Sequence, residues 1–149
     1  MRILLDYRPA LRERTGVGEY VHEVARALLD SAPAGESLTL FSSSFKDRLA
    51  ADTLPGASIV DRRIPNQWLN FLWHRAEWPP VERVAGGEFD VVHALHPLLI
   101  PSRTAARLVT IHDLEKTLVR DRAFERHAFT EPQSVHQANE IVSCFTGTI

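Results

Sequence analysis

The sequence predicts an α/β fold in which a Rossmann-like parallel sheet carries helices on both faces. Short apolar runs alternate with longer amphipathic segments along the chain, which is the pattern of repeated β–α–β units. Such crossovers are right-handed, and they cover both faces of a parallel sheet. Polar residues follow several of the apolar runs, at the edge where parallel α/β sheets bind their ligands. We therefore expect a site at the carboxyl ends of the strands.

The first strand and the first helix are predicted from their apolar patterns. Arg2–Asp6 is a short apolar run that ends in an acid, which suits a central parallel strand. A helix is expected to begin at Val17, because apolar residues recur from there at the spacing of one helix face. Pro33 and Gly35 then end the helix. Its apolar face consists of Val17, Val21, Val24, Ala25, Leu28 and Leu29.

The remaining elements follow from the same two periodicities. Further strands are expected at residues 37–41, 58–64, 89–93, 107–111 and 140–143. Helices are expected at residues 45–51, with Ser44 as the N-cap, at 66–75 and 81–85, and over most of 120–138. Turns are expected at residues 42–44 and 55–56, and the two prolines at 79–80 are expected to break or restart the helix, which ends at the glycines 86–87. Together these elements form one domain over residues 1–149.

Length and composition fit an ordinary globular domain. The 149 residues are 44% hydrophobic and 24% charged, enough to bury a proper core. The formal net charge of -2 argues against binding to nucleic acid by bulk electrostatics. No apolar run approaches the ~20 residues of a membrane span, and no signal peptide is visible. We therefore expect a cytoplasmic protein.

The helix expected at 66–75 carries an aromatic stripe. Its residues are Trp68, Leu69, Leu72, Trp73 and Ala76. Packing of this stripe against the sheet is favoured over a membrane-surface helix, because the flanking charges do not form a basic face. Contact between an exposed edge of the stripe and a lipid acceptor stays open.

Thr15, Gly16, Val17 and Gly18 form the turn between the first strand and the first helix. The free N–H groups and the positive dipole end of a helix can hold an anion there. Glycine also lets the backbone approach a phosphate closely. The turn is not a complete G-x-G-x-x-G motif, because Val21 stands at the third small position. It is either a cradle for phosphate or carboxylate, or a turn that only begins a helix.

His112 and Asp113 directly follow an apolar run. A histidine at a strand end can act as a base near neutral pH, or can hydrogen-bond a sugar hydroxyl. Neighbours on a strand point to opposite faces, so a direct pair between the two side chains is not assured. The alternative is a capping pair in a surface turn. His93 ends its own strand and is expected at the same edge.

Histidines also raise the question of a metal site. His93, His96 and His112 lie close in the chain, but no acidic or cysteine partner stands at ligand spacing. We therefore expect no metal and no resident cofactor. The single cysteine, Cys144, excludes an internal disulfide and is expected to be a small buried hydrophobe.

An ordered set of short motifs runs along the chain. Its members are Asp6, Arg8, residues 15–20 (T-G-V-G-E-Y), 71–73, Pro79, 90–93, Pro97, Pro101, 109–114 (V-T-I-H-D-L) and 138–146. The set resembles the retaining glycosyltransferases of family 4 (group 1), which have the GT-B fold. The strongest match is the segment at residues 109–114, which is similar to the family's Thr-x-His-Asp segment.

The resemblance implies one half of a GT-B fold, in which two Rossmann-like domains face each other across a cleft. Residues 1–149 would be the N-terminal, acceptor-side domain, apparently truncated, without the C-terminal domain that binds the nucleotide sugar. We expect such a chain to be inactive, or nearly so, on its own, because one wall of the catalytic cleft is missing.

The resemblance also assigns roles to residues. Thr15, Gly16, Val17 and Gly18 would contact the donor diphosphate. His112 would lie by the transferred sugar, with Asp113 orienting the loop. Tyr20 and His93 would bind substrate.

The expected substrates are a nucleotide-diphosphate sugar donor and a glycan or lipid-linked acceptor, with peripheral contact at the inner membrane face and no nucleic acid. One alternative is a stand-alone Rossmann-like module that binds a sugar or phosphate without catalysis. An unrelated Rossmann-like oxidoreductase is disfavoured by the missing third glycine.

Overall fold

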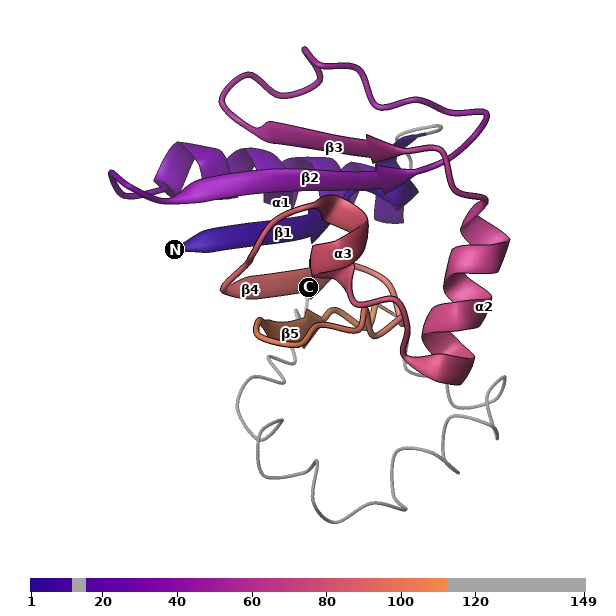
Figure 1. The fold of residues 1–149 in the computed structure, drawn as a ribbon. Helices are drawn as coiled ribbons and strands as arrows, with labels where there is room; N and C mark the ends of the chain where they lie inside the picture. The colour runs from indigo at the N-terminus through magenta and orange to yellow at the C-terminus, as the bar shows by residue number, and fades with distance from the viewer. Residues whose placement is uncertain (12–15, 113–149) are drawn as a thin grey trace. The chain divides into compact units, whose positions relative to one another are not determined.

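The computed structural model describes residues 1–11 and 16–112, which form an α/β unit around one parallel sheet (Figure 1). The sheet has five strands in the order β3-β2-β1-β4-β5, and every neighbouring pair is parallel. The Rossmann-like parallel sheet that the sequence predicts is thereby confirmed. The strands are β1 (Arg2–Asp6), β2 (Ser37–Ser43), β3 (Ser58–Arg62), β4 (Val91–Ala94) and β5 (Ala106–Val109).

Helices lie on both faces of the sheet, as the sequence predicts. The long helix α1 (Val17–Ser31) covers one face, and α2 (Asn66–Ala76) and α3 (Val81–Ala85) lie on the other (Figure 1). A short 3-10 helix, η1 (Arg8–Leu11), follows β1. The helix that begins at Val17 is the one expected from its apolar spacing.

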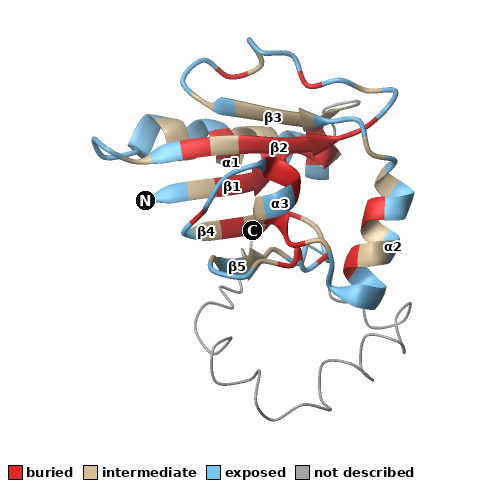
Figure 2. Ribbon diagram, in the orientation of Figure 1, coloured by how far each residue is buried: buried red, intermediate tan, exposed pale blue. Residues whose placement is uncertain are grey.

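Alternating side chains of the strands build the two halves of the core. Leu4 of β1 and Phe41 of β2 pack with α2 and α3, whereas Leu5 and Leu40 pack with α1. All four side chains are fully buried, and Figure 2 shows the central strands as the most buried part of the sheet. Burial on both faces explains why these strands read as continuous apolar runs in the sequence.

β1 and β4 are the neighbouring strands at which the order of strands in the sheet reverses direction. From β1 the chain passes through α1 to β2 on one side, and it later returns to β4 on the other side of β1. The connections therefore diverge beyond the carboxyl ends of these two strands, which creates the crevice where such sheets bind ligands. Leu5 pairs with His93 across this junction.

The segment after β2 differs from the prediction. Ser42 and Ser43 belong to β2 rather than to a turn, and residues 45–51 form no helix. The Ser44 hydroxyl does accept hydrogen bonds from the N–H groups of Lys46 and Asp47, at 3.3 and 3.0 Å, as an N-cap would. The Asp61 carboxylate accepts the N–H of Leu49 at 3.3 Å. This contact diverts an N–H group that a helix would need.

Only part of the predicted aromatic stripe of α2 is buried. Leu69 and Trp73 are each 1% exposed, and both pack against the sheet. Trp68 is 66% exposed, so its place in the core was wrongly predicted. Ala76, at the end of the helix, is also exposed. Leu69 and Trp73 are four residues apart and so face the same side, and the short helix has room for little more on its buried side.

Several strand ends differ from prediction by one or two residues, because hydrogen-bond pairing with a neighbour, not hydropathy, sets where a strand stops. The strand expected at 140–143, the helix expected at 120–138 and Cys144 lie outside the described residues. Within residues 1–11 and 16–112, no helix is long and apolar enough to cross a membrane.

Candidate functional site

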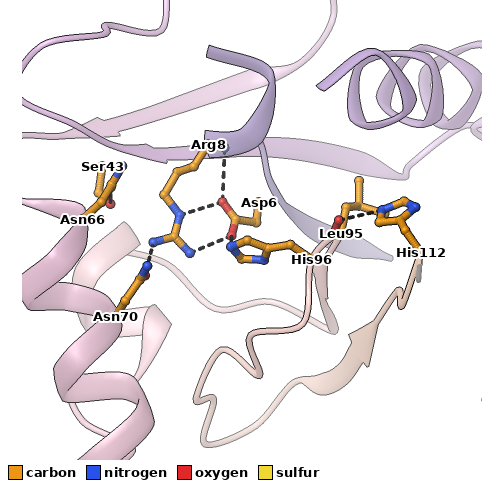
Figure 3. Close-up of polar contacts among 8 residues, drawn as sticks. All are labelled: Asp6, Arg8, Ser43, Asn66, Asn70, Leu95, His96 and His112. Atoms are coloured by element: carbon orange, nitrogen blue, oxygen red, sulfur yellow. Dashed lines mark hydrogen bonds and ion pairs between the residues drawn. The ribbon is translucent and has the colours of Figure 1, made fainter. Parts of the chain in front are cut away.

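The carboxyl edge, meaning the edge where the carboxyl ends of β1, β4 and β5 lie, gathers most of the polar residues singled out from the sequence. Asp6 ends β1, Gly16 is the N-cap of α1 and His112 lies three residues beyond β5. Two further residues, Arg8 and His96, join them there (Figure 3). The expectation that strand ends bring these groups to one edge agrees with the topology of the sheet.

Asp6 and Arg8 form a buried ion pair at the end of β1. Arg8 donates from Nε to Asp6 Oδ1 at 2.8 Å and from Nη2 to Oδ2 at 2.6 Å. The Arg8 backbone N–H donates to Oδ1 as well, at 3.2 Å. The side chains are 0% and 5% exposed for Asp6 and Arg8. This two-point geometry satisfies most of the hydrogen-bonding capacity of a carboxylate that water cannot reach.

Arg8 also ties the end of β1 to α2. Its Nη1 donates to the side-chain oxygen of Asn70 at 2.7 Å (Figure 3). The guanidinium carbon lies 5.1 Å from the Trp73 ring centroid and 5.8 Å from that of Phe41. Aromatic faces stabilise a cation held in this way. Arg8 therefore fixes α2 over the carboxyl edge by charge, hydrogen bonding and stacking together.

The ion pair determines the charge state of Asp6. Burial raises the pKa of the Asp6 carboxyl, but the charge and hydrogen bonds of Arg8 outweigh burial and hold this pKa below its usual range. Asp6 is therefore ionised at neutral pH and balanced by Arg8. The pair presents a dipole, and no net charge, to the rest of the edge.

His96 follows β4 and lies against the ion pair. Its Nε2 is 3.5 Å from Asp6 Oδ2, and its side chain is 28% exposed. Its Nδ1 is buried and has no hydrogen-bond partner among the described residues. Burial lowers the pKa of His96, and although the Asp6 charge opposes this, the pKa stays below its ordinary value. His96 is therefore neutral at pH 7.

His112 lies beside the start of α1. Its Nε2 hydrogen-bonds the carbonyl oxygen of Leu95 at 2.9 Å, so this nitrogen carries the proton and donates (Figure 3). Its ring meets the edge of the Tyr20 ring, with centroids 4.7 Å apart and planes at 85°. Tyr20 belongs to the first turn of α1 and is 43% exposed. The two predicted site residues are thus brought together.

The glycine turn starts α1 in a conformation that suits glycine. Gly16 has φ 55 and ψ -116 and makes no side-chain capping bond, and its carbonyl accepts the Tyr20 N–H at 3.1 Å. The N–H groups of the first helical turn therefore have no partner within the helix. Val17 is exposed and Gly18 is buried. Thr15 and Asp113, also predicted as site residues, lie outside the described residues.

His93 lies within the sheet, beside β5. Its Nε2 hydrogen-bonds the Thr110 hydroxyl at 2.9 Å, and burial lowers its pKa to about 4. His93 pairs with Leu5 on the side of the sheet that packs against α1. Its tie to Thr110 holds the segment that leads from β5 to His112. The role of His93 as a direct substrate contact stays a prediction.

Sequence reasoning did not assign roles to Arg8 beyond the resemblance, nor to Asn70 or His96. Asp6 and Arg8 are two residues apart, a spacing that signals an ion pair only when the chain turns sharply after a strand. Asn70 and His96 reach the site only through the tertiary fold. No group of three or more histidine, cysteine or acidic side chains suited to a metal ion occurs within the part of the chain that the structure describes.

Chemically, the carboxyl edge offers the backbone N–H groups at the start of α1 for an anion and the His112 imidazole for a hydroxyl group. Two hollows of about 420 and 550 Å³ lie elsewhere, around α3, and none of the predicted site residues that the structure describes lines them. No protein-family model, curated protein or solved structure matches the chain.

Proposed function

We propose that the chain is the N-terminal domain of a retaining glycosyltransferase, which moves a sugar from a nucleotide-diphosphate sugar to a glycan or lipid-linked acceptor. The observation that carries this proposal is the contact between Tyr20 and His112, at 4.7 Å between ring centroids. It joins the first turn of α1, whose N–H groups have no partner within the helix, to a histidine at the end of the sheet. An anion site and a hydroxyl-binding group thus lie side by side.

Transfer of a sugar from such a donor releases a nucleotide diphosphate, so negative charge grows on the leaving oxygen. Backbone N–H groups aimed at that charge stabilise the transition state. Gly16, Val17 and Gly18 supply such groups at the amino end of α1, where the helix dipole adds to the attraction. Gly16 carries no Cβ, which leaves room for the phosphate oxygens.

His112 is proposed to hold a hydroxyl of the transferred sugar. Its Nε2 donates to Leu95, so its Nδ1 is left to accept a hydrogen bond. The bond to Leu95 and the edge contact with Tyr20 fix the ring before any ligand arrives. Asp113 is proposed to orient the loop that carries this histidine. Preorganisation of this kind raises the rate because the site does not reorganise during the reaction.

The acceptor is proposed to approach over α2. Trp68 and Phe71 expose 66% and 57% of their surface on this helix. Arg75 is one turn beyond Phe71, and the helix contains no acidic residue. Exposed aromatics beside a cation suit the interface of an anionic membrane. We therefore propose a cytoplasmic enzyme with a glycan or lipid-linked acceptor and peripheral membrane contact.

Catalysis is proposed to need a second domain, because a cleft with one wall cannot position donor and acceptor together. The test compares this chain with the longest form that the gene encodes. Binding and turnover are measured with a panel of nucleotide-diphosphate sugars by calorimetry and by release of the diphosphate. The site variants are His112→Ala and Gly16→Val. The matched controls are His74→Ala and Gly35→Val, because Gly35 also has a positive φ of 94 but lies remote from the carboxyl edge.

Turnover by the longer form, lost with His112→Ala and Gly16→Val but kept with both controls, would support the proposal. Tight sugar binding by the 149-residue chain, with no turnover in any form, would overturn it in favour of a binding module without catalysis. Equal losses with Gly16→Val and Gly35→Val would show that backbone strain, and not phosphate binding, explains the glycine result.

A further inference from the structure

We infer that the larger of the two hollows beside α3 binds a phosphate or carboxylate that is carried on a sugar or planar ring. The guanidinium groups of Arg62 and Arg83 meet the anion, and the indole of Trp78 meets the ring. The inference goes beyond the proposed function, because no residue described at the carboxyl edge lines this hollow. Its lining residues are Arg62, Ile64, Trp78, Pro79, Arg83 and Val84.

The hollow lies where the end of β3, α3 and the link between α2 and α3 meet. Arg62 ends β3, Trp78 and Pro79 follow α2, and Arg83 and Val84 belong to α3. Figure 1 shows α2 and α3 on the same side of the sheet. The volume of about 550 Å³ falls within the roughly 300–1,000 Å³ of small-molecule sites. Arg62, Trp78 and Arg83 are all exposed, so a ligand reaches them without any opening of the fold.

The charge of the hollow selects an anion. Two of its six lining residues are arginines, and none is acidic. The Arg83 guanidinium makes no hydrogen bond or ion pair within the part of the chain that the structure describes. Two acids line the smaller hollow, which Arg83 also borders, but each has another partner. Glu82 accepts the N–H of Arg103 at 3.0 Å, and Glu88 pairs with Arg2 at 3.6 Å. An anion in the larger hollow therefore meets positive charge that these acids do not neutralise.

Arg62 is held in place before any ligand arrives. Its Nε donates to the carbonyl oxygen of Val84 at 2.8 Å, and its Nη2 donates to that of Ala85 at 2.9 Å. A guanidinium has five N–H groups, so three remain in a planar fork that suits phosphate or carboxylate oxygens. Gly86 leaves room for this arrangement, because a Cβ at its φ of 83 would lie only 3.1 Å from Arg62 Nη2. Arg62 thus offers an anion a fixed cation, and Arg83 offers an adaptable one.

Trp78 is the reason to expect a ring beside the anion. Its side chain lines the hollow and is 51% exposed. Its neighbour Pro79 is fixed, because the Pro79 carbonyl accepts a hydrogen bond from Trp73 Nε1 at 2.8 Å. An exposed indole offers an apolar face on which another ring stacks. Inorganic phosphate gains only the arginines, whereas a phosphate carried on a ring gains the indole as well.

The experiment uses the 149-residue chain labelled with ¹⁵N, and it records the indole N–H signal of Trp78 and the Nε–H signal of Arg62. The four probes are glucose 6-phosphate, adenosine monophosphate, inorganic phosphate and glucose. We expect at least one ring phosphate to shift both signals saturably, with a Kd about tenfold below that of inorganic phosphate, and glucose to shift neither. The comparison of the two ring phosphates shows whether a sugar or a planar base is the preferred ring.

Arg83→Gln and Trp78→Ala should each raise the Kd of the ring phosphate about fivefold to tenfold, for one charged contact or one stacked ring. Both side chains are exposed, so both variants should fold, whereas Arg62 is left intact because it holds α3. The matched controls are Arg103→Gln, at an exposed arginine of the smaller hollow, and Phe45→Ala, at an aromatic that is 64% exposed and does not line the larger hollow. Each control should change the Kd by less than about twofold.

Signals of Trp78 and Arg62 that stay fixed at millimolar concentrations of every probe would overturn the inference. Equal Kd values for inorganic phosphate and both ring phosphates, unaffected by Trp78→Ala, would overturn it in favour of a general anion patch. A loss with Arg103→Gln as large as that with Arg83→Gln would place the ligand in the smaller hollow and would also overturn it. Every signal is read within the hollow itself, so none of these outcomes decides the donor site proposed at the carboxyl edge.

Discussion

Asp6 and Arg8, two residues apart, close a two-point ion pair in which the carboxylate is 0% exposed. The pair lies at the end of β1, where the chain turns into η1. Arg8 continues from there to Asn70 of α2. One short segment thus anchors both the central strand and a helix from the other half of the chain.

We expect Arg8→Met to lower the free energy of unfolding by about 3–5 kcal/mol, because it leaves the Asp6 charge buried without a partner. Urea denaturation followed by circular dichroism measures this change. Arg2→Met is the matched control, since Arg2 pairs with Glu88 and Asp90 through a side chain that is 50% exposed. Its cost should stay below about 1 kcal/mol. Equal costs for the two substitutions would contradict a structural role for the buried pair.

The two tryptophans of α2 should also differ in how much unfolding free energy their substitution costs, because one is buried and the other is exposed. Trp73 is 1% exposed, and its Nε1 donates to the carbonyl of Pro79 at 2.8 Å. Trp73→Ala should cost about 3–5 kcal/mol of unfolding free energy, from the cavity and the lost hydrogen bond. Trp68 is 66% exposed, so Trp68→Ala should stay within about 0.5 kcal/mol. A larger loss from Trp68→Ala in the same urea titration would mean that this ring packs on something in the native chain.

Local apolar patterns were enough to predict most of the helices and strands along the chain, but not all of them. The strand at Arg2–Asp6 and the helix beginning at Val17 were predicted correctly, because each buries a face whose residues recur at the right period. The helix at 45–51 was wrong, because Asp61 binds the N–H of Leu49 across 12 residues. No local pattern contains such a contact.

The candidate site likewise contains residues that the sequence could place and residues that it could not. Asp6 and His112 could be placed at the carboxyl edge, because parallel strands end there together. The link from Arg8 to Asn70 spans 62 residues, and only the tertiary fold creates it. His96 lies in a loop without periodicity, and its place beside Asp6 depends on the pairing of β4 with β1. The catalytic and substrate-binding roles of the site residues stay predictions.

His93 should remain uncharged through the range in which an ordinary histidine titrates. Burial lowers its pKa to about 4, whereas in the unfolded chain the ordinary value is 6.5. Between those values the unfolded chain binds a proton that the folded chain does not, so the contribution of His93 to stability is lost as the pH falls from 6.5 toward 4. The ring signals of His93 should therefore stay constant from pH 8 to about 5 in an NMR titration.

The matched stability experiment uses His93→Gln, which keeps a hydrogen bond to Thr110 but cannot take up a proton. Its free energy of unfolding should fall less than that of the wild type between pH 6.5 and 4, with His74→Gln, at an exposed position, as the control. A His93 signal that titrates with a midpoint near 6.5 would show that its ring is solvated in the native state.

Gly16→Ala should destabilise the start of α1 by about 1–2 kcal/mol, because alanine rarely adopts a positive φ. Gly16 has φ 55, and no atom of residues 1–11 or 16–112 lies within 4 Å of the position its Cβ would take. The expected loss is therefore conformational, with no steric clash against these residues. Gly87→Ala is the matched control, since its Cβ would meet only the Phe89 ring at an ordinary 3.6 Å and its φ is not positive. Hydrogen exchange adds a local measurement: the Tyr20 amide, which donates to the Gly16 carbonyl, should exchange faster in Gly16→Ala alone. If the two substitutions cost the same and the Tyr20 amide is unaffected, the glycine is not what sets the conformation of this turn.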